Sequence, residues 1–462
     1  MCSTRQCAME RLLNSLISSM ILPEYEATAM GMKPKVDSMI QTSEHPKPIL
    51  NANLTRALPL AASTQLLAVC STCGASYPAE PDTSVCSCTR QSNLLIRYST
   101  GAATKAALLA STGSTGKPSL WRYSPLLPAH PRYASRLDVG WTPLIEAGSI
   151  GRVRLLLKDE TRNPSGSLKD RASEVVLALA AQNNIRNVIV ASTGNAGASL
   201  ACLGAAMGIS VTIIVPENVP GAKLAQSVAY GARVYRVEGT YDDAFNLANE
   251  VSRHRDVLNR NTGRNPYTRE GKKTCAFEIT EQLGWQAPDW VVVPTGDGNI
   301  LSGMAKGFEE LFKIGMITSL PRLIAAQAKS SNAIARRYRG DHFAVAQPRS
   351  LADSISVGEP RDADLAVRAL YTSRGSAIEL TDTEIIDAVH SLARQHGCFV
   401  EPSAAAAYAA TERLVSFGMT QPGQTVVTIL TGTGLKDLRP VLQSQKYADA
   451  PRVKPGAWQK IE

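Results

Sequence analysis

Residues 163–171 read Asn-Pro-Ser-Gly-Ser-Leu-Lys-Asp-Arg, which places a lysine, Lys169, directly behind a turn sequence. The apolar stretch VRLLLKD precedes them, so Gly166 and Ser167 are predicted to end a tight loop and Lys169 to begin a helix. There the positive end of the helix dipole disfavours an ammonium ion and helps to keep the amine neutral. A neutral lysine amine is a nucleophile that forms Schiff bases with carbonyl groups. The alternative is that Lys169 is an ordinary solvated helix residue.

Three glycine-rich loops also follow apolar stretches, at residues 191–201, 293–303 and 430–437. In the first loop, the backbone amides of Ser192 to Ala196 are expected to point at one small anion, and a carboxylate fits such a nest. In the second, Gly296 and Gly298 allow the close backbone approach that a phosphate requires. Each loop alone could be a simple turn. Three of them beside a candidate Schiff-base lysine indicate a ligand site.

Alternating strand and helix segments, which begin near residue 138, must position these loops. Strands are predicted from VRLLLKD, NVIVAST, VTIIVP, RVYRVEG, WVVVPTG, RLIAAQA and TVVTILTG. Helices are predicted at 169–183, 197–207, 222–230, 241–252, 274–284, 301–313, 382–396 and 403–416. This order, with apolar strands covered on both faces, is typical of a parallel α/β sheet. Ligands of such sheets bind beyond the carboxyl ends of the strands, where these loops lie.

The composition describes a soluble globular protein. The 462 residues are 44% hydrophobic, and the apolar stretches are much shorter than the roughly 20 residues of a membrane helix, so no membrane partner is expected. The formal net charge is +9, but the basic residues are not interleaved with aromatic residues, so no nucleic-acid partner is expected. Two basic clusters, at 263–273 and 337–343, are interpreted as solvated loops, with contact to an anion as the alternative.

Four of the nine cysteines form the pattern C-x2-C-x12-C-x-C: Cys70, Cys73, Cys86 and Cys88. Each closely spaced pair can close a knuckle around one tetrahedral ion, and four thiolates at about 2.3 Å are what structural zinc prefers. The pattern therefore predicts a small zinc ribbon with four cysteine ligands. A ribbon without metal, or one that forms disulfides when oxidised, is the alternative.

The N-terminal 65 residues are rich in Ser, Thr, Met and Pro without sustained periodicity, and they are expected to form a disordered leader. Its glutamates, Glu10, Glu24 and Glu26, argue against a mitochondrial presequence, and no secretory cleavage pattern follows the apolar part. The odd cysteine count suits a reducing compartment. A cytoplasmic location is therefore expected, with organelle import as the alternative.

The motifs resemble, in order, those of the fold type II pyridoxal-phosphate enzymes, which are similar to the tryptophan synthase β subunit, and among them the threonine synthases. KDETRNPSGSLKDRAS is similar to the family's lysine motif, STGNAGAS to its asparagine loop, VPTGDGNILSGMAKGFEEL to its phosphate loop and LTGTGLKD to its C-terminal loop. A further stretch, EPSAAAA from Glu401, also matches. The resemblance covers about residues 140–440 and extends to the Cys-rich module, which is similar to one that precedes many threonine synthases.

The resemblance implies a role for each loop. Lys169 would form the Schiff base with pyridoxal 5′-phosphate and shuttle the α-proton. Asn195 would hydrogen-bond the cofactor's 3′-hydroxyl, and Ser192 and Thr193 would hold the substrate carboxylate. The cofactor phosphate would be seated by Gly296, Asp297, Gly298 and Asn299. Thr431 would face the pyridine nitrogen, where a hydroxyl favours elimination and replacement over transamination.

The chain departs from the threonine synthase pattern where the substrate is chosen. Enzymes that use O-phosphohomoserine usually carry an arginine in a segment like NPHRLEGQKT, with Asn and Ser a few residues before it. Here Thr268 stands at the arginine position, and Thr262 and Gly263 stand at the Asn and Ser positions. An arginine there would clamp a phosphate with a planar group of five N–H donors, so its replacement by threonine is not a conservative change. The basic residues that could replace the clamp in binding substrate are Arg264, Arg269 and Lys272.

Two enzyme functions follow from the resemblance. The first is a carbon–oxygen lyase of amino-acid biosynthesis that converts O-phospho-L-homoserine to L-threonine and phosphate. The second is β-elimination or β-replacement on serine, threonine or an activated serine, as in dehydratases and cysteate- or cysteine-forming enzymes. A catalytically idle homologue that binds the cofactor is a third reading. Both enzyme functions expect a small amino-acid substrate, and the family suggests a homodimer.

The domain organisation is expected to follow the family too. The segments are a leader (1–65), a zinc-ribbon-like module with the four cysteines (66–98), a linker (99–137), a large cofactor-binding domain (138–184 and 269–445), a small α/β domain (185–268) and a tail (446–462). The small domain would close over the substrate and exclude water.

Overall fold

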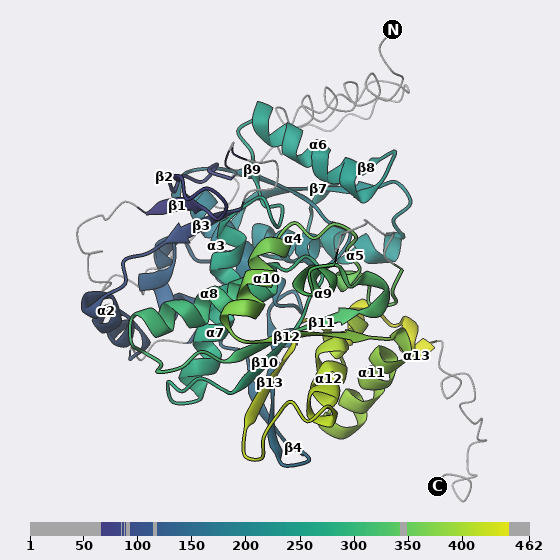
Figure 1. Cartoon of the computed structure of the whole chain (residues 1–462). Helices are drawn as coiled ribbons and strands as arrows, with labels where there is room; N and C mark the ends of the chain where they lie inside the picture. The colour runs from purple at the N-terminus through teal and green to yellow at the C-terminus, as the bar shows by residue number, and fades with distance from the viewer. Residues whose placement is uncertain are drawn as a thin grey trace, which may run out of the picture.

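The computed structural model of the chain describes residues 66–84, 86, 88, 93–113, 118–341 and 349–442 (Figure 1). The expected leader at 1–65 and the expected tail at 446–462 lie outside these residues. The described residues form a three-stranded, a six-stranded and a four-stranded sheet. None of the described helices is long and apolar enough to cross a membrane.

The six-stranded sheet carries three of the four strands that lead into the candidate site loops. Its order is β12-β11-β10-β13-β5-β4, and its neighbours pair in parallel except β4 and β5. The strands are β4 Leu144–Ile150, β5 Val153–Asp159, β10 Trp290–Pro294, β11 Arg322–Ala328, β12 Ser376–Leu380 and β13 Thr425–Leu430. The sheet is therefore mixed rather than purely parallel, because the unpredicted edge strand β4 runs antiparallel to β5.

Helices cover both faces of this sheet (Figure 1). Val291 and Val293 of β10 pack into the apolar cluster that includes α7 (Tyr267–Gln282) and α8 (Asn299–Lys313). Trp290 and Val292 pack into the cluster that includes α12 (Pro402–Ser416). Side chains alternate between the two faces of a strand, so a strand buried on both faces needs a continuous apolar run.

The four-stranded sheet is parallel and has the order β8-β7-β6-β9. Its strands are β6 Asn187–Ala191, β7 Ser210–Pro216, β8 Arg233–Val237 and β9 Leu258–Asn259. Its connecting helices are α4 Asn195–Met207, α5 Gly221–Ala229 and α6 Tyr241–His254. All of these elements lie within residues 185–268, and they occupy the upper part of Figure 1.

The predicted helices form close to their expected bounds, with one exception. Seven of them differ from prediction by no more than two residues at either end, including α3 Lys169–Gln182, α8 and α11 Asp382–His396. Two short helices that were not predicted, α9 Ala333–Tyr338 and α10 Ala363–Thr372, lie between strands β11 and β12 in the sequence. The exception is α7, which begins at Tyr267 rather than at residue 274.

The early start of α7 overturns one interpretation of the sequence. The basic cluster at 263–273 is largely helical and buried, so its reading as a solvated loop is wrong. The polar residues of α7 contact other polar groups in the interior. For example, Lys273 and Lys306 both contact the Glu270 carboxylate, at 2.6 and 2.9 Å. Buried charges that are paired in this way carry no apolar periodicity, which is why the pattern misleads.

The N-terminal module forms a three-stranded antiparallel sheet of β1 Leu67–Cys70, β2 Ser76–Pro78 and β3 Leu94–Arg97. The segment expected as a linker at 99–137 contains helix α2 Ala102–Thr112 and the short helices η2 Leu120–Leu126 and η3 Pro131–Tyr133. Tyr123 of η2 meets Phe277 of α7 edge to face, with ring centroids 5.3 Å apart. This segment therefore packs on helix α7.

Candidate active site

Two of the candidate loops are joined directly around Lys169, which is the first residue of α3. The amide of Leu168 donates to the carbonyl of Thr431 at 2.9 Å, and the amide of Thr433 donates to the carbonyl of Gly166 at 3.0 Å. Within the lysine loop, the Asp170 carboxylate accepts hydrogen bonds from the Ser165 amide and hydroxyl at 2.6 and 2.5 Å. These bonds fix the backbone that presents the lysine.

The Lys169 side chain is half-buried, and its amine donates no hydrogen bond to a described residue. Burial lowers the pKa of Lys169 from 10.5 to about 8. The Glu401 and Asp297 carboxylates oppose this shift, whereas the cations of Arg260 and Lys436 add to it. The result is an amine that is substantially neutral slightly above neutral pH, as a Schiff-base lysine needs.

The N-terminus of α4 presents unbonded amides beside this lysine loop. The Ser192 hydroxyl oxygen accepts from the amides of Gly194 and Gly197 at 3.3 and 3.0 Å, which holds the loop in shape. Within the described residues the amides of Thr193, Asn195 and Ala196 have no acceptor. Amides at a helix N-terminus attract anions, so this end of α4 can hold a carboxylate.

Asn195, the first residue of α4, points its amide group at a buried carboxylate. Its Nδ2 donates to Oε1 and Oε2 of Glu401 at 2.9 and 3.1 Å. Burial raises the pKa of Glu401, and the bond from Asn195 opposes that shift. The Glu401 amide donates to the carbonyl of Gly432 at 3.0 Å, so Glu401 joins the asparagine loop to the C-terminal loop. The sequence resemblance includes the stretch that begins at Glu401 but assigns this residue no task of its own.

The loop after β10 is an open amide cradle at the start of α8. In the part of the chain that the structure describes, the amides of residues 296–301 donate to no carbonyl or side chain, and no side chain caps α8. Gly298 has a φ of 88°, which favours glycine, and a Cβ at Gly296 would lie 2.7 Å from the Cα of Ile355. The loop therefore has the geometry that a phosphate group requires.

Asp297 and Asn299, the polar residues of this cradle, are held from outside it. The Asp297 carboxylate accepts from the Arg361 amide at 2.6 Å, and burial raises its pKa to about 6. Asn299 donates through Nδ2 to Asp362 at 3.0 Å and accepts through Oδ1 from Lys272 at 2.5 Å. These bonds orient the side chains and leave the backbone amides of the loop open.

Thr431 follows β13 and lies at the carboxyl end of the sheet, next to the lysine loop. The residue is 6% exposed, and its hydroxyl has no hydrogen bond to the described residues. A weak hydrogen-bonding group, rather than an ion, therefore stands at this end of the strand.

The basic residues near the missing clamp differ in how they are engaged. The Arg269 guanidinium contacts Asp362 at 2.5 Å, the Ser302 hydroxyl at 3.1 Å and the Leu94 carbonyl at 3.1 Å. Lys272 is 1% exposed and has no carboxylate partner in the described chain, and burial lowers its pKa well below 10.5. Arg264 is half-buried. Thr268 is buried and donates to the Asn265 carbonyl at 2.8 Å.

Arg260 is a site residue that sequence reasoning missed. It follows the two-residue strand β9, is fully buried, and interacts electrostatically with both Lys169 and Lys272. The only sequence signal is an arginine after the stretch VLN, whose two apolar residues are too few to predict a strand. Its position is therefore visible only in the fold.

A buried ion network lies beneath the lysine loop. Arg171, on the first turn of α3, pairs with Glu160 and Glu278 at 2.6 Å each, and Lys158 pairs with Glu278 at 2.9 Å. All of these side chains are fully buried. Because each charge meets an opposite charge, the network fixes α3 to β5 and α7 at the level of the site.

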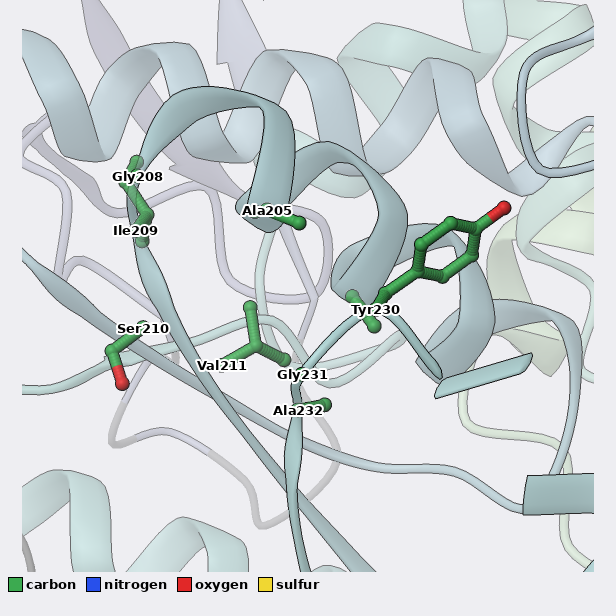
Figure 2. Close-up of a pocket in the computed structure, with 10 residues that line it drawn as sticks. Ala205, Gly208, Ile209, Ser210, Val211, Tyr230, Gly231 and Ala232 are labelled. Atoms are coloured by element: carbon green, nitrogen blue, oxygen red, sulfur yellow. The ribbon is translucent and has the colours of Figure 1, made fainter. Parts of the chain in front are cut away.

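A separate cavity of about 260 Å³ lies beside the four-stranded sheet. Figure 2 shows residues that line it. Its lining includes Ala205, Gly208, Ser210 and Tyr230. These residues lie where strands β7 and β8 begin, whereas the candidate site loops leave the carboxyl ends of their strands. The cavity is therefore at the end of the small sheet away from Lys169, and it offers no charged side chain.

The four cysteines of the N-terminal module lie together. Their sulfur atoms all lie within 4.8 Å of one another, and the Cys70–Cys88 and Cys73–Cys86 sulfur distances are both 3.6 Å. Tetrahedral zinc with bonds of about 2.3 Å needs sulfur–sulfur edges of about 3.8 Å. The set of donors thus fits a structural zinc ion.

Comparison with known proteins agrees with this geometry. The family model described as "Pyridoxal-phosphate dependent enzyme" matches residues 135–432. The chain is 38% identical to the threonine synthase of Methanocaldococcus jannaschii over 327 residues, which cover 69% of this chain and 80% of that protein. It is 36% identical to the threonine synthase of Methanosarcina acetivorans over 382 residues, which cover 81% of this chain and 93% of that protein.

Solved structures share the fold at lower identity. The processed form of threonine deaminase isoform 2 from Solanum lycopersicum has a TM-score of 0.58 at 20% identity, covering 73% of this chain and 96% of that chain. Maize serine racemase has a TM-score of 0.58 at 21% identity, covering 76% of this chain and 98% of that chain.

The site fits the cofactor of this family. Lys169 offers a free amine of lowered pKa, and the cradle at 296–301 offers unbonded amides for a phosphate. The nest at the start of α4 offers a second set of amides for a substrate carboxylate. The chain is thus a pyridoxal-phosphate-dependent lyase, and it belongs to the fold type II family in the group of threonine synthases and their close relatives.

Proposed function

We propose that the protein converts O-phospho-L-homoserine and water to L-threonine and phosphate. The observation that carries the proposal is the placement of Lys169 between two sets of unbonded amides, one suited to a substrate carboxylate and one to the cofactor phosphate. The relatives named threonine synthase, at 36–38% identity over most of their own length, support this substrate.

In this proposal each loop has one task. The amides of Thr193, Asn195 and Ala196 hold the substrate carboxylate, and the 296–301 cradle holds the cofactor phosphate. When bound, pyridoxal phosphate supplies an electron sink that stabilises negative charge at the substrate's α-carbon. Asn195 would orient the ring through a hydrogen bond to the ring's 3′-hydroxyl, and Thr431 would face the ring nitrogen with its own hydroxyl, which favours elimination and replacement chemistry.

Lys169 does the proton transfer. Its lowered pKa of about 8 allows the neutral amine to accept the α-proton near neutral pH and to return it later. The Glu401 carboxylate, held by Asn195, interacts with the Lys169 ammonium and favours its protonated form. Closure of the small domain would keep water out until it is needed at the β-carbon.

The alternative function is β-elimination or β-replacement on serine, threonine or an activated serine. It is favoured by one observation: Thr268 replaces the expected arginine, and the neighbouring Arg269 is already paired with Asp362. A substrate without a phosphate needs no clamp, so the loss would then be neutral.

The experiment is to record phosphate and amino-acid products from O-phospho-L-homoserine with purified protein, with Lys169→Ala as the control. Threonine formed together with an equal amount of phosphate supports the first function. Release of a 2-oxo acid or a β-substituted amino acid from serine-type substrates, with none from O-phospho-L-homoserine, supports the alternative. A visible cofactor band with no turnover of either substrate class would mark an idle homologue.

A further inference from the structure

Arg260 carries a donor that nothing in the described structure satisfies. Its Nε donates to the Ser173 hydroxyl at 3.4 Å, and its Nη1 donates to the Thr262 hydroxyl at 3.0 Å. Its Nη2 is buried and has no hydrogen-bond partner. A guanidinium has five N–H donors, so most of this group's capacity is unused.

Among the described residues the Arg260 guanidinium has no carboxylate partner, which sets it apart from the other buried arginines. The other fully buried arginines of the described chain are Arg171, which pairs with Glu160 and Glu278, and Arg269, which pairs with Asp362. Burial lowers the pKa of Arg260 to about 10, and the more distant Tyr241 and Asp170 oppose this shift. An unpaired buried charge is costly, so a fold that keeps one is expected to use it on a ligand.

The contacts of Arg260 indicate where a ligand of its guanidinium would bind. Ser173 lies one helical turn after Lys169 on α3, so the Arg260 guanidinium lies against the helix face that carries the lysine. Its second partner, Thr262, lies two residues further along the chain, six positions before Thr268. Lys272 instead contacts Asn299 at the start of α8, on the side of the cofactor cradle.

We propose that Arg260 binds the phosphate group of a phosphorylated amino-acid substrate. It would take over the task of the arginine that the family carries at the position of Thr268. The inference rests on the proposed function, because it names the group that recognises the same substrate. An arginine suits this task since its planar fork donates two parallel hydrogen bonds to a phosphate. Thr262 positions the fork through its bond to Nη1.

The test compares holoenzymes of the wild type, Arg260→Gln, Arg260→Lys and Arg253→Gln. Arg253 is an exposed arginine near the end of α6 and serves as the matched control. Binding of O-phospho-L-homoserine and of L-homoserine is followed through the visible absorbance of the bound cofactor. We expect Arg260→Gln to weaken binding of the phosphorylated ligand on the order of 10- to 100-fold and binding of L-homoserine by less than about twofold.

Two further comparisons sharpen the result. Arg260→Lys is expected to recover part of the phosphate selectivity, because it restores the charge without the fork, and Arg253→Gln is expected to match the wild type. Inorganic phosphate is expected to raise the thermal midpoint of the wild-type holoenzyme and to leave that of Arg260→Gln unchanged. Without phosphate, Arg260→Gln is expected to be at least as stable as the wild type, since it removes an unpaired buried charge.

The outcomes separate this inference from the proposed function. If the wild type prefers the phosphorylated ligand and Arg260→Gln keeps that preference, the inference is overturned and the proposed function stands. Weaker cofactor binding in Arg260→Gln with an unchanged ligand ratio also overturns it, and assigns Arg260 to the cofactor's phosphate. If selectivity for the phosphorylated ligand depends on Arg260 but no threonine forms, the inference is supported and the threonine synthase reaction is ruled out.

Discussion

At the scale of single residues, Lys169 sets the pH at which the cofactor can attach. Its folded pKa of about 8 lies below the ordinary 10.5, so the neutral, nucleophilic form grows as pH rises through 8. We predict that the rate of cofactor attachment to the apoprotein rises about tenfold between pH 7 and pH 9 and then levels off. The measurement is the growth of the visible cofactor band after mixing.

Lys169→Ala is the control for this profile and is expected to show no such band. A rate that keeps rising up to about pH 10.5 would mean that the lysine has an ordinary pKa and that the site does not tune it.

The residue scale also shows where sequence reasoning stops. Lys169, the α4 nest and the 296–301 cradle are predictable because each lies at a junction between a strand and a helix. The roles of basic residues are not. Arg269 stands beside the missing clamp in sequence but pairs with Asp362, which lies 93 positions away. Arg260 has no such partner in the part of the chain that the structure describes, and no local sequence pattern predicts that difference.

At the scale of elements, the buried network around Arg171 holds α3 in place. Although burial raises the pKa of Glu278, Arg171 and Lys158 bring it down to about 2. We predict that Arg171→Met lowers the free energy of unfolding by about 3–5 kcal/mol, because it leaves two carboxylates without their main partner. Urea unfolding followed by circular dichroism measures the loss.

Arg154→Met is the matched control for this change. Arg154 pairs with Glu146 at 2.5 Å, but their side chains are 50% and 53% exposed, so its loss is expected to cost less than about 1 kcal/mol. Equal effects of the two changes would show that the buried network contributes no more than a surface pair.

The phosphate cradle carries its own titratable group, Asp297. Burial raises the pKa of Asp297 to about 6, so its carboxylate is charged above pH 6 and repels a phosphate in the loop. We predict that Asp297→Asn binds the cofactor more tightly at pH 8, on the order of tenfold, and that the gain shrinks as pH falls below 6. Equilibrium dialysis of the cofactor against the apoprotein at both pH values measures this.

Asp364→Asn, a change in an exposed aspartate, is the control for Asp297→Asn and is expected to leave cofactor affinity unchanged. A gain that persists below pH 6 would show that the Asp297 carboxylate stays charged there.

Strands buried on both faces are the elements that the sequence predicts best, because β10 is a continuous apolar run and β5 and β13 are mainly apolar. Strand β4 is an edge with several exposed residues, and its run LIEAGSI has neither a continuous nor an alternating apolar pattern. The start of α7 escapes prediction for the opposite reason. Its polar residues are buried against one another, so the helix lacks the apolar stripe on which periodicity depends.

At the scale of the whole molecule, the N-terminal ribbon contacts the parts of the fold that hold the cradle. The Leu94 carbonyl accepts from Arg269 at 3.1 Å, and Asn93 donates to the carbonyl of Arg361 at 3.0 Å. Arg361 in turn donates its amide to Asp297, and Arg269 holds Asp362, the partner of Asn299. The ribbon is thus linked to Asp297 through one residue, Arg361, and to Asn299 through two, Arg269 and Asp362.

We therefore predict that the zinc ribbon supports cofactor binding. The purified protein is expected to contain one zinc ion per chain, and Cys86→Ser to contain none, because the tetrahedral set then lacks a thiolate. Without the ion, β3 loses its anchor and the contacts to Arg269 and Arg361 loosen. The cofactor dissociation constant is then expected to rise about two- to tenfold. Metal analysis and cofactor titration measure the two effects.

Cys398→Ser separates loss of zinc from loss of any buried thiol. Cys398 lies in the large domain, away from the ribbon, so this variant is expected to keep both its zinc and its cofactor affinity. Wild-type protein that is purified under reducing conditions and lacks metal would refute the zinc assignment. Loss of zinc from Cys86→Ser with unchanged cofactor affinity would show instead that the hydrogen bonds from Leu94 and Asn93 do not transmit the ribbon's order to the cradle.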